Sequence, residues 1–302
     1  MGDFNRRTTA EEVSADIDLT GRHAIVTGAN TGIGRETARV LALRGASVTM
    51  ACRDLEKAGA ARDAILASDS RLETDQLEVM RLDLGRLDQV RDFARDFLST
   101  SRPIHLLINN AGVMLPDRRE TADGFEAHLG VNHLGHFLLT RLLEERVRAS
   151  APARIVNVSS DALQFASLTE SLEDLNWEAR RFSGWRAYGD SKLMNVLFTN
   201  ELNRRFASKG VVSNALHPGI VKTDLGRDQP WWMAAVGLLM LPISKSPEQG
   251  AATSVYLATA EALGREGAGY FADCGPGRVH RLSGNAELES ALWLRSEELV
   301  GL

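Results

Sequence analysis

Residues 27–34 read TGANTGIG, and this stretch decides the fold that the sequence predicts. An apolar run typical of a strand, HAIVTGA, leads into it, and a helical pattern, GIGRETARVLALRG, follows it and ends at Gly45. Gly28, Gly32 and Gly34 therefore lie where a strand turns into a helix. Glycines there allow a tight bend and a close approach of the backbone to a pyrophosphate, and the helix N-terminus supplies the positive end of a dipole. A glycine-rich turn can be only a turn, but its place in a βαβ unit favours a dinucleotide site.

The same alternation continues along the rest of the chain. Six further strand-like runs are SVTMACR, LEVMRLDL, IHLLINNAG, ARIVNVSS, VVSNALHPG and GAGYFADC, and helical patterns separate them, the longest at 125–149 and 185–208. Strands that are apolar on both faces and separated by helices are typical of a buried parallel sheet. We predict an α/β fold of the Rossmann type, a doubly wound, seven-stranded parallel sheet with helices on both faces. Residues 1–302 would form one domain, with a solvated N-terminal arm at 1–19 and a helix-bearing C-terminal extension at 275–302.

Composition restricts the classes of function. The chain has 302 residues, of which 44% are hydrophobic and 25% are charged, with a net charge of −5, so no basic field indicates a nucleic-acid partner. Cys52 and Cys274 are far apart and have no metal-ligand spacing, so we expect no metal site and a reducing compartment. The start of the chain shows no secretory signal, and no run reaches the roughly 18 apolar residues of a membrane span. We therefore expect a cytoplasmic protein.

Residues 185–195 read WRAYGDSKLMN and place Tyr188 and Lys192 one helical turn apart on a shared face. A phenol has a pKa of about 10, and a nearby cation favours its ionised form. The pair could therefore be a general acid/base together with the cation that lowers its pKa. Because tyrosine and lysine are common, this spacing alone is a weak signal and needs support from other motifs.

Six motifs in a fixed order supply that support, and with them the chain resembles the short-chain dehydrogenase/reductase superfamily from about Thr20 to the C-terminus. They are TGANTGIG, NNAG at 109–112, VNHLGHF with Asn132, NVSS with Ser159 and Ser160, YGDSK with Tyr188 and Lys192, and HPG at 217–219.

The resemblance implies a set of catalytic roles. Tyr188 would exchange the proton, and Lys192 would also bind the nicotinamide ribose. Asn132 would hold a water that links Lys192 to solvent. Ser160 would donate to the substrate oxygen; Ser159 is its rival and otherwise a structural hydroxyl at the strand end.

The resemblance also implies a nicotinamide dinucleotide site along the carboxyl ends of the strands. Its predicted cofactor-binding residues, besides Tyr188 and Lys192, are Gly28, Asn30, Thr31, Gly32, Ile33, Gly34, Arg53, Asp83, Leu84, Asn110, Ala111, Gly112, Pro218, Gly219, Ile220 and Thr223. We interpret His133, His136 and His217 as packing or surface residues.

The second strand-like run ends in ACRD, where an acidic residue would select NAD(H) by binding the ribose 2′-hydroxyl. Cys52 stands at the acidic position and Arg53 follows it. A guanidinium suits a 2′-phosphate, and Asp54 can instead cap the next helix. The sequence therefore favours NADP(H) over NAD(H), although Arg53 could be only a solvated charge.

Ser160 precedes Tyr188 by 28 positions, about twice the gap in many family members. The extra stretch, QFASLTESLEDLNWEARRFSG, and the C-terminal part of the chain resemble the branch that contains the retinol dehydrogenases and their bacterial relatives. Trp177 in this stretch could touch substrate or could serve as a cover.

Residues 222–246 would form a substrate-capping segment, and within it 231–243 read WWMAAVGLLMLPI. A cap this apolar predicts a bulky apolar substrate. Two alternatives stay open, a peripheral membrane contact and a subunit contact. The two long helices could also pair into a homodimer or homotetramer.

These observations predict an NADP(H)-dependent oxidoreductase that interconverts an apolar alcohol and its carbonyl. One alternative is reduction of a carbon–carbon double bond with the same Tyr188–Lys192 pair. Another is a nucleotide-sensing regulator without turnover, although such proteins typically lose the tyrosine, lysine or serine that this chain retains.

Overall fold

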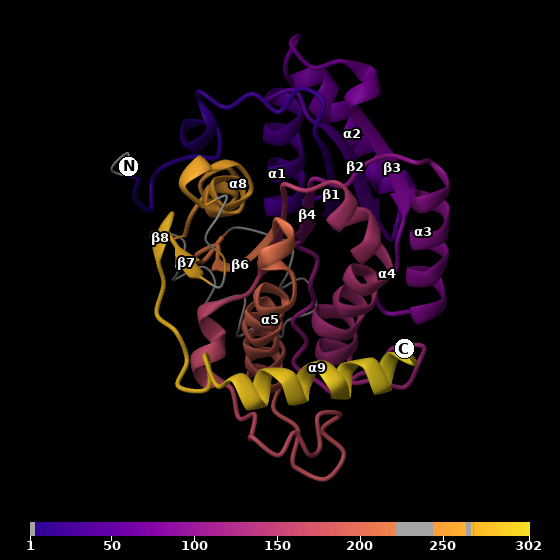
Figure 1. Ribbon diagram of the computed structural model, residues 1–302, viewed down its shortest axis with the longest axis vertical. Helices are drawn as coiled ribbons and strands as arrows, with labels where there is room; N and C mark the ends of the chain where they lie inside the picture. Colours follow the sequence, from indigo (N-terminus) through magenta and orange to yellow (C-terminus); the bar gives the residue numbers. More distant parts are fainter. Residues whose placement is uncertain (1–3, 222–243, 264–266, 268) are drawn as a thin grey trace.

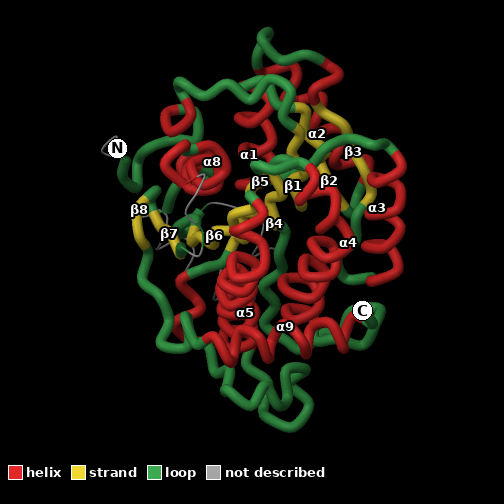
Figure 2. The backbone as a smooth tube through the Cα atoms, in the orientation of Figure 1, coloured by secondary structure: helices red, strands yellow, loops and turns green. Residues whose placement is uncertain are grey.

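A single eight-stranded sheet organises the computed structural model, which describes residues 4–221, 244–263, 267 and 269–302 (Figures 1 and 2). The strand order is β3-β2-β1-β4-β5-β6-β7-β8. The strands are β1 His23–Thr27, β2 Ser47–Cys52, β3 Leu77–Arg81, β4 Leu106–Asn109, β5 Ala153–Val158, β6 Val211–His217, β7 Tyr270–Ala272 and β8 Gly275–Pro276. Strands β1 to β7 pair in parallel, which confirms the predicted doubly wound, seven-stranded sheet.

The sequence reading missed β8, a two-residue strand that pairs antiparallel with β7. Asp273 and Cys274 adopt φ angles of 51° and 60°, which reverse the chain directly after β7. Phe271 then faces Pro276, and Ala272 faces Gly275. A two-residue strand is too short to show an alternation of apolar and polar residues in the sequence. Its position depends only on the residues of the preceding turn.

Helices cover both faces of the sheet, as predicted. They are α1 Gly32–Leu43, α2 Leu55–Ser68, α3 Leu87–Ser99, α4 Gly135–Ala149, α5 Gly184–Phe206, α7 Pro247–Gly250, α8 Ala252–Thr259 and α9 Ala286–Val300. Helices α3, α4, α5 and α9 share one hydrophobic cluster with the sheet, and α1, α2 and α8 share the other. Figure 1 shows α9, at the C-terminal end, crossing over α5 and α4.

The central strands lie between these layers with almost no exposed side chain. All five residues of β1 are buried, because apolar runs without alternation have no solvent face. Chain order reverses between β1 and β4, and such a switch point opens a crevice at the carboxyl ends of the strands. The turn after β1 and the loops after β4, β5 and β6 all meet at this edge.

The predicted helix at 125–149 is two elements. A π-helical segment, η3, spans His128–Leu134, and α4 continues from Gly135. A π-helix adds a residue to the turn and is frequent at functional sites. Gly135 permits the junction to lie against the sheet, since a Cβ there would meet the carbonyl oxygen of Leu84 at 2.5 Å. Asn132 lies within the widened turn.

The N-terminal segment, expected to be a solvated arm, packs on the domain through a few apolar side chains, while most of residues 4–19 stay exposed or partly exposed. Ala10, Val13 and Leu19 are buried in the cluster that contains α8, and the Ala10 amide donates to the Glu248 carbonyl at 2.8 Å. The apolar residues are too sparse there to give a visible period, but each finds a partner on the folded domain. The C-terminal extension does contain the predicted helix, α9.

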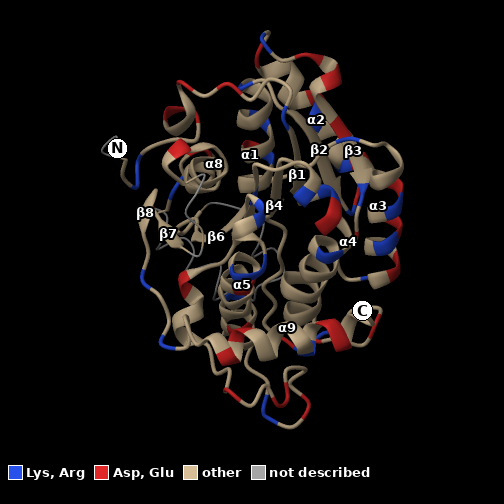
Figure 3. Ribbon diagram, viewed as in Figure 1, with Lys and Arg blue, Asp and Glu red and all other residues tan. Residues whose placement is uncertain are grey.

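The described parts of the chain contain no helix that is both long and apolar enough to cross a membrane. Figure 3 shows basic and acidic residues interspersed along the ribbon. Residues 222–243, which include most of the predicted cap, all of 231–243 and Thr223, lie outside the described residues.

Candidate active site

The turn after β1 forms a cradle of the shape that a pyrophosphate requires. Gly28 has a φ of 66°, which side chains rarely adopt. A Cβ on Gly34 would lie 2.4 Å from both the Gly28 carbonyl oxygen and the Asn110 Nδ2 atom. Thr31 is exposed and extended directly before α1 begins at Gly32, so the first turn of the helix faces the crevice. These residues fit the predicted phosphate site, to which Asn30 and Ile33 add partly exposed backbone.

Strand β2 ends beside this cradle. Cys52 is buried, while Arg53 is exposed and has no hydrogen-bond or ion-pair partner among the described residues. Asp54 caps α2 by accepting from the Lys57 amide at 3.1 Å, as the sequence predicted. Asp83, after β3, accepts from the Gly85 amide at 3.0 Å, and Leu84 is buried behind it. The adenine contact of Asp83 stays a prediction.

The loop after β4 is fixed to β1. The Asn110 and Ala111 amides both donate to the Thr27 hydroxyl at 2.9 Å, and the Asn110 side chain donates to the Thr27 carbonyl at 2.7 Å. A Cβ on Gly112 would lie 3.5 Å from the Lys192 Nζ atom. The nucleotide cradle and the catalytic lysine are therefore parts of one site.

Ser160, Tyr188 and Lys192 come together from β5 and α5. Ser160 caps the short helix η4 (Asp161–Phe165) by accepting from the Ala162 amide at 3.2 Å, and its side chain lies close enough to Tyr188 to lower the pKa of that phenol. The Lys192 Nζ atom lies 5.5 Å from the centre of the Tyr188 ring and donates to the Val158 carbonyl at 2.9 Å. The Ser159 hydroxyl donates to the Lys192 carbonyl at 2.7 Å, which gives it the structural role. The geometry favours Ser160 as the hydroxyl that faces substrate.

Asn132 joins this group through its side chain. Its amide nitrogen donates to the Val113 carbonyl and the Ser191 hydroxyl, both at 3.0 Å, and its amide oxygen accepts from the Val113 amide at 2.8 Å. The side chain therefore fixes the loop after β4 against α5. A role in holding water stays a prediction.

Burial shifts the pKa values of both Tyr188 and Lys192. It raises the pKa of Tyr188 to about 12, against the opposing effect of the Ser160 hydrogen bond, and it lowers the pKa of Lys192 to about 8. The expectation that Lys192 lowers the tyrosine pKa is wrong for this arrangement. The ammonium lies beside the ring and bonds a carbonyl instead of the phenol oxygen, so the loss of solvation dominates.

The predicted packing histidines are buried and neutral. Burial lowers the pKa of His136 to about 3 and that of His133 to about 4. His217, at the end of β6, lies 3.5 Å from Asp161. Pro218 is buried after it, and Ile220 is 51% exposed toward the crevice edge. No cluster of potential metal ligands occurs among the residues that the structure describes.

A pocket of about 700 Å³ lies between the segment after Ser160 and the start of α5. Its lining residues are Gln164, Phe165, Ala166, Ser167, Ser183, Trp185 and Arg186. Phe165 is 65% exposed and Trp185 49% exposed, and their ring centres are 6.4 Å apart. Trp185 precedes Tyr188 by three positions and so shares its helix face. The sequence did not single out these two residues because nothing in it shows that they stay exposed.

The comparisons with known proteins fit this geometry. The profile of the family described as short chain dehydrogenase matches residues 22–171. Human retinol dehydrogenase 12 is 46% identical over 289 residues, which cover 95% of this chain and 89% of that protein.

The chain belongs to the short-chain dehydrogenase family.

Within this family of oxidoreductases it is similar to the retinol dehydrogenases. A solved structure of an uncharacterised protein from Mycobacterium paratuberculosis is 38% identical, with a TM-score of 0.76, over 95% of this chain and 97% of that one. A candidate NAD(P)-dependent gluconate 5-dehydrogenase from Beutenbergia cavernae, solved with bound NADP at low occupancy, is 26% identical, with a TM-score of 0.66, over 85% and 96% of the two chains. The family implies a nicotinamide dinucleotide cofactor, and the glycine cradle fits one.

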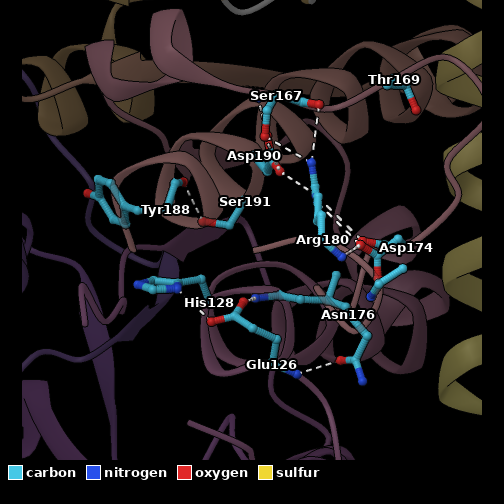
Figure 4. Close-up of polar contacts among 12 residues, drawn as sticks. Glu126, His128, Ser167, Thr169, Asp174, Asn176, Arg180, Tyr188, Asp190 and Ser191 are labelled. Atoms are coloured by element: carbon cyan, nitrogen blue, oxygen red, sulfur yellow. Dashed lines mark hydrogen bonds and ion pairs between the residues drawn. The ribbon is translucent and has the colours of Figure 1, made fainter. Parts of the chain in front are cut away.

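Sequence reasoning missed a second buried group beside Tyr188. The side chains of Glu126 and His128 share a hydrogen bond of 2.7 Å at the start of η3 (Figure 4). Neither residue stands in a motif that carried the resemblance. The available signal was the short E-x-H spacing, which is too common to single out.

Proposed function

We propose that this short-chain dehydrogenase is an NADP(H)-dependent oxidoreductase that interconverts a bulky apolar alcohol and its carbonyl. The observation that carries the proposal is the meeting of Ser160, Tyr188 and Lys192 at the edge of the sheet that also holds the glycine cradle. A proton donor, a second hydroxyl and a buried cation are the groups that carbonyl reduction requires of the protein.

When bound, the nicotinamide would supply or accept the hydride at the substrate carbon. The polypeptide handles the oxygen. Ser160 donates a hydrogen bond to it, and Tyr188 delivers the proton that turns the carbonyl oxygen into a hydroxyl. In the reverse direction Tyr188 takes that proton back. Lys192, whose Nζ atom lies close to Gly112, would hold the nicotinamide ribose.

The preference for NADP(H) rests on Arg53. Its exposed guanidinium follows β2 beside the glycine cradle and has no partner among the described residues, so it is free to bind a 2′-phosphate. Asp54, the acidic residue that could instead bind the ribose of NAD(H), accepts from the Lys57 amide and caps α2, which supports the same preference.

The apolar substrate is supported by the pocket at the start of α5. Two large exposed aromatic rings stand on its wall, Phe165 at the end of η4 and Trp185 one helical turn before Tyr188 on α5. Exposed apolar surface of this kind is typical of a binding site. The relatives named retinol dehydrogenases make a retinoid the first substrate to test.

The test is a panel of retinoid, steroid, terpenoid and simple aromatic carbonyls with NADPH, followed by loss of NADPH absorbance and product analysis. Tyr188→Phe should lower turnover by about 10²- to 10⁴-fold and leave NADPH binding nearly intact, because only the transferable proton is lost. Tyr256→Phe is the matched control, since Tyr256 is also buried but lies on α8, and it should keep full activity. Turnover within tenfold of the parent in Tyr188→Phe would contradict the assignment.

A further inference from the structure

The Glu126–His128 pair is buried beside the catalytic tyrosine, with side chains 1% and 0% exposed (Figure 4). The His128 Nε2 atom accepts from the Leu115 amide at 2.9 Å. An amide can only donate, so Nε2 carries the lone pair and the neutral ring carries its proton on Nδ1. That proton bonds Glu126 at 2.7 Å, and the other carboxylate oxygen accepts from the Leu129 amide at 3.0 Å. Both ring nitrogens are therefore occupied and the ring is held in one orientation.

The ring so held contacts Tyr188. Their centres are 6.0 Å apart with an angle of 68° between the planes, the edge-to-face arrangement that aromatic pairs prefer. Because neither ring nitrogen is free, His128 has no means of exchanging a proton with the phenol. What it supplies is a fixed surface for one side of the Tyr188 ring. His128 lies one helical turn before Asn132. Each of the two side chains accepts a hydrogen bond from a backbone amide of the loop after β4, His128 from Leu115 and Asn132 from Val113.

Residues of the insertion between Ser160 and Tyr188 also contact the Glu126–His128 pair. The Asn176 side-chain oxygen accepts from the Glu126 amide at 2.6 Å. The Phe182 ring stacks on His128 at 6.4 Å, and the edge of Trp177 packs on Phe182 at 5.6 Å. Trp177 is buried, so it serves as a cover.

The insertion is also bonded to the catalytic helix itself. The Arg180 guanidinium lies 3.6 Å from the Trp177 ring centre and pairs with Asp190 at 2.9 Å. Asp190 is two residues beyond Tyr188 on α5, and its side chain is 2% exposed. It also accepts from the Ser167 amide at 2.5 Å. These contacts connect six residues in series: Tyr188, His128, Phe182, Trp177, Arg180 and Asp190. Because Asp190 and Tyr188 both lie on α5, the series of contacts is closed.

We propose that Glu126 and His128 are positioning residues for Tyr188, and that the insertion exists in part to hold them. This inference rests on the proposed function, since it assumes that the Tyr188 proton is transferred. A displacement of about 1 Å in a reacting group can lower the rate a hundredfold. Fixing the position of the Tyr188 ring should therefore have a measurable effect on kcat.

The test compares two histidines that pack against aromatic rings. His128→Phe keeps an aromatic ring beside Tyr188 but loses both hydrogen bonds. His23→Phe is the matched control, because His23 is buried against Phe97, bonds the Thr49 hydroxyl at 2.9 Å and begins β1, at the opposite end of that strand from the site. We expect His128→Phe to lower kcat by about 10- to 100-fold with KM for NADPH changed less than about threefold. His23→Phe should lower the melting temperature and leave kcat within about twofold.

A second variant, Glu126→Gln, keeps the volume of the side chain. The carboxylate accepts from two donors, His128 and the Leu129 amide, and an amide side chain has only one oxygen, so one donor must face an N–H group. It should show the same loss of kcat with an unchanged apparent pKa in the kcat–pH profile, because the pair transfers no proton. Phe182→Leu, which disturbs the stack from the insertion, should lower kcat in the same direction.

Three results would overturn the inference. One is a kcat within twofold of the parent in all the folded variants of this group. Another is an equal loss in His128→Phe and His23→Phe, which would mark a general structural role. The third is a shifted apparent pKa in Glu126→Gln, which would make the pair part of a proton path. Turnover retained in Tyr188→Phe would instead refute the proposed function, so the two failures are distinguishable.

Discussion

Lys192→Met should make the protein more stable while it removes activity. The Lys192 ammonium is buried, and no carboxylate among the described residues forms an ion pair with it. Burial lowers its pKa from 10.5 to about 8. At 1.36 kcal/mol per pKa unit, the charged form costs the native state about 3 kcal/mol. Methionine has a similar length and no charge, and the Val158 carbonyl still accepts from Asn195 at 3.3 Å.

The pKa values of Lys192 in the native and unfolded chains determine how the stability difference between parent and variant changes with pH. Below pH 8 both the native and the unfolded chain hold the lysine proton, so the full penalty is present. Between pH 8 and 10.5 only the unfolded chain holds it, so the parent gains stability as pH rises. The advantage of Lys192→Met should therefore be largest at pH 6–8 and shrink above pH 8. Tyr188, with a pKa of about 12, stays protonated throughout this range.

The assay is urea denaturation of parent and variant at several pH values from about 6 to 10, with turnover measured in parallel. Lys245→Met is the matched control, because Lys245 is also buried but pairs with Asp273 at 2.5 Å. It should lose stability at neutral pH, since Asp273 is left without its partner. A Lys192→Met protein that is less stable than the parent at pH 7, or whose advantage does not fall as pH rises, would refute the reasoning.

Three further sets of substitutions test the site. Arg53→Glu should raise the NADPH dissociation constant by about 10- to 100-fold and that of NADH much less, since charge-assisted hydrogen bonds to the 2′-phosphate are lost; an equal response of both nucleotides would exclude Arg53 as the selector. Ser160→Ala should lower kcat by about 10²-fold, while Ser159→Ala, which loses only the bond to Lys192, should cost about 1 kcal/mol of stability and keep kcat. Phe165→Leu combined with Trp185→Leu should raise KM for large apolar carbonyls about tenfold and leave small carbonyls unchanged; equal effects on both sizes would remove the pocket from the substrate path.

The parts of the fold that sequence predicts are those with a strong local signal. The glycine turn and the alternation of apolar strands with helices predict the doubly wound parallel sheet, because its buried strands have no polar face to confuse the pattern. The eighth strand and the packing of residues 4–19 escape prediction for the opposite reason. Each depends on a few residues whose partners lie far away in sequence, such as Ala10 with Glu248.

In the site, too, the residues that stand in sequence motifs are predictable and those that depend on distant contacts are not. Tyr188, Lys192 and Ser160 are predicted from ordered motifs, and the structure brings them together. The direction of the Tyr188 pKa shift is not predictable from spacing, because spacing places a cation near the phenol but does not give its burial or the carbonyl it bonds. Glu126, His128 and Asn176 come from separate segments, and only folding shows that they form one group.

Burial also determines which chemistry the polypeptide favours on its own. It shifts the pKa of Tyr188 up to about 12 and that of Lys192 down to about 8, so both groups move toward their neutral forms. With its pKa raised to about 12, the phenol is protonated at pH 7. A protonated phenol next to Ser160 is the state that reduces a carbonyl, since it already holds the proton to be delivered. The reverse reaction requires the phenolate, which buried surroundings disfavour unless positive charge lies close by. In this arrangement the Lys192 ammonium bonds the Val158 carbonyl and lies 5.5 Å from the centre of the Tyr188 ring, so it leaves the raised pKa of the phenol uncompensated.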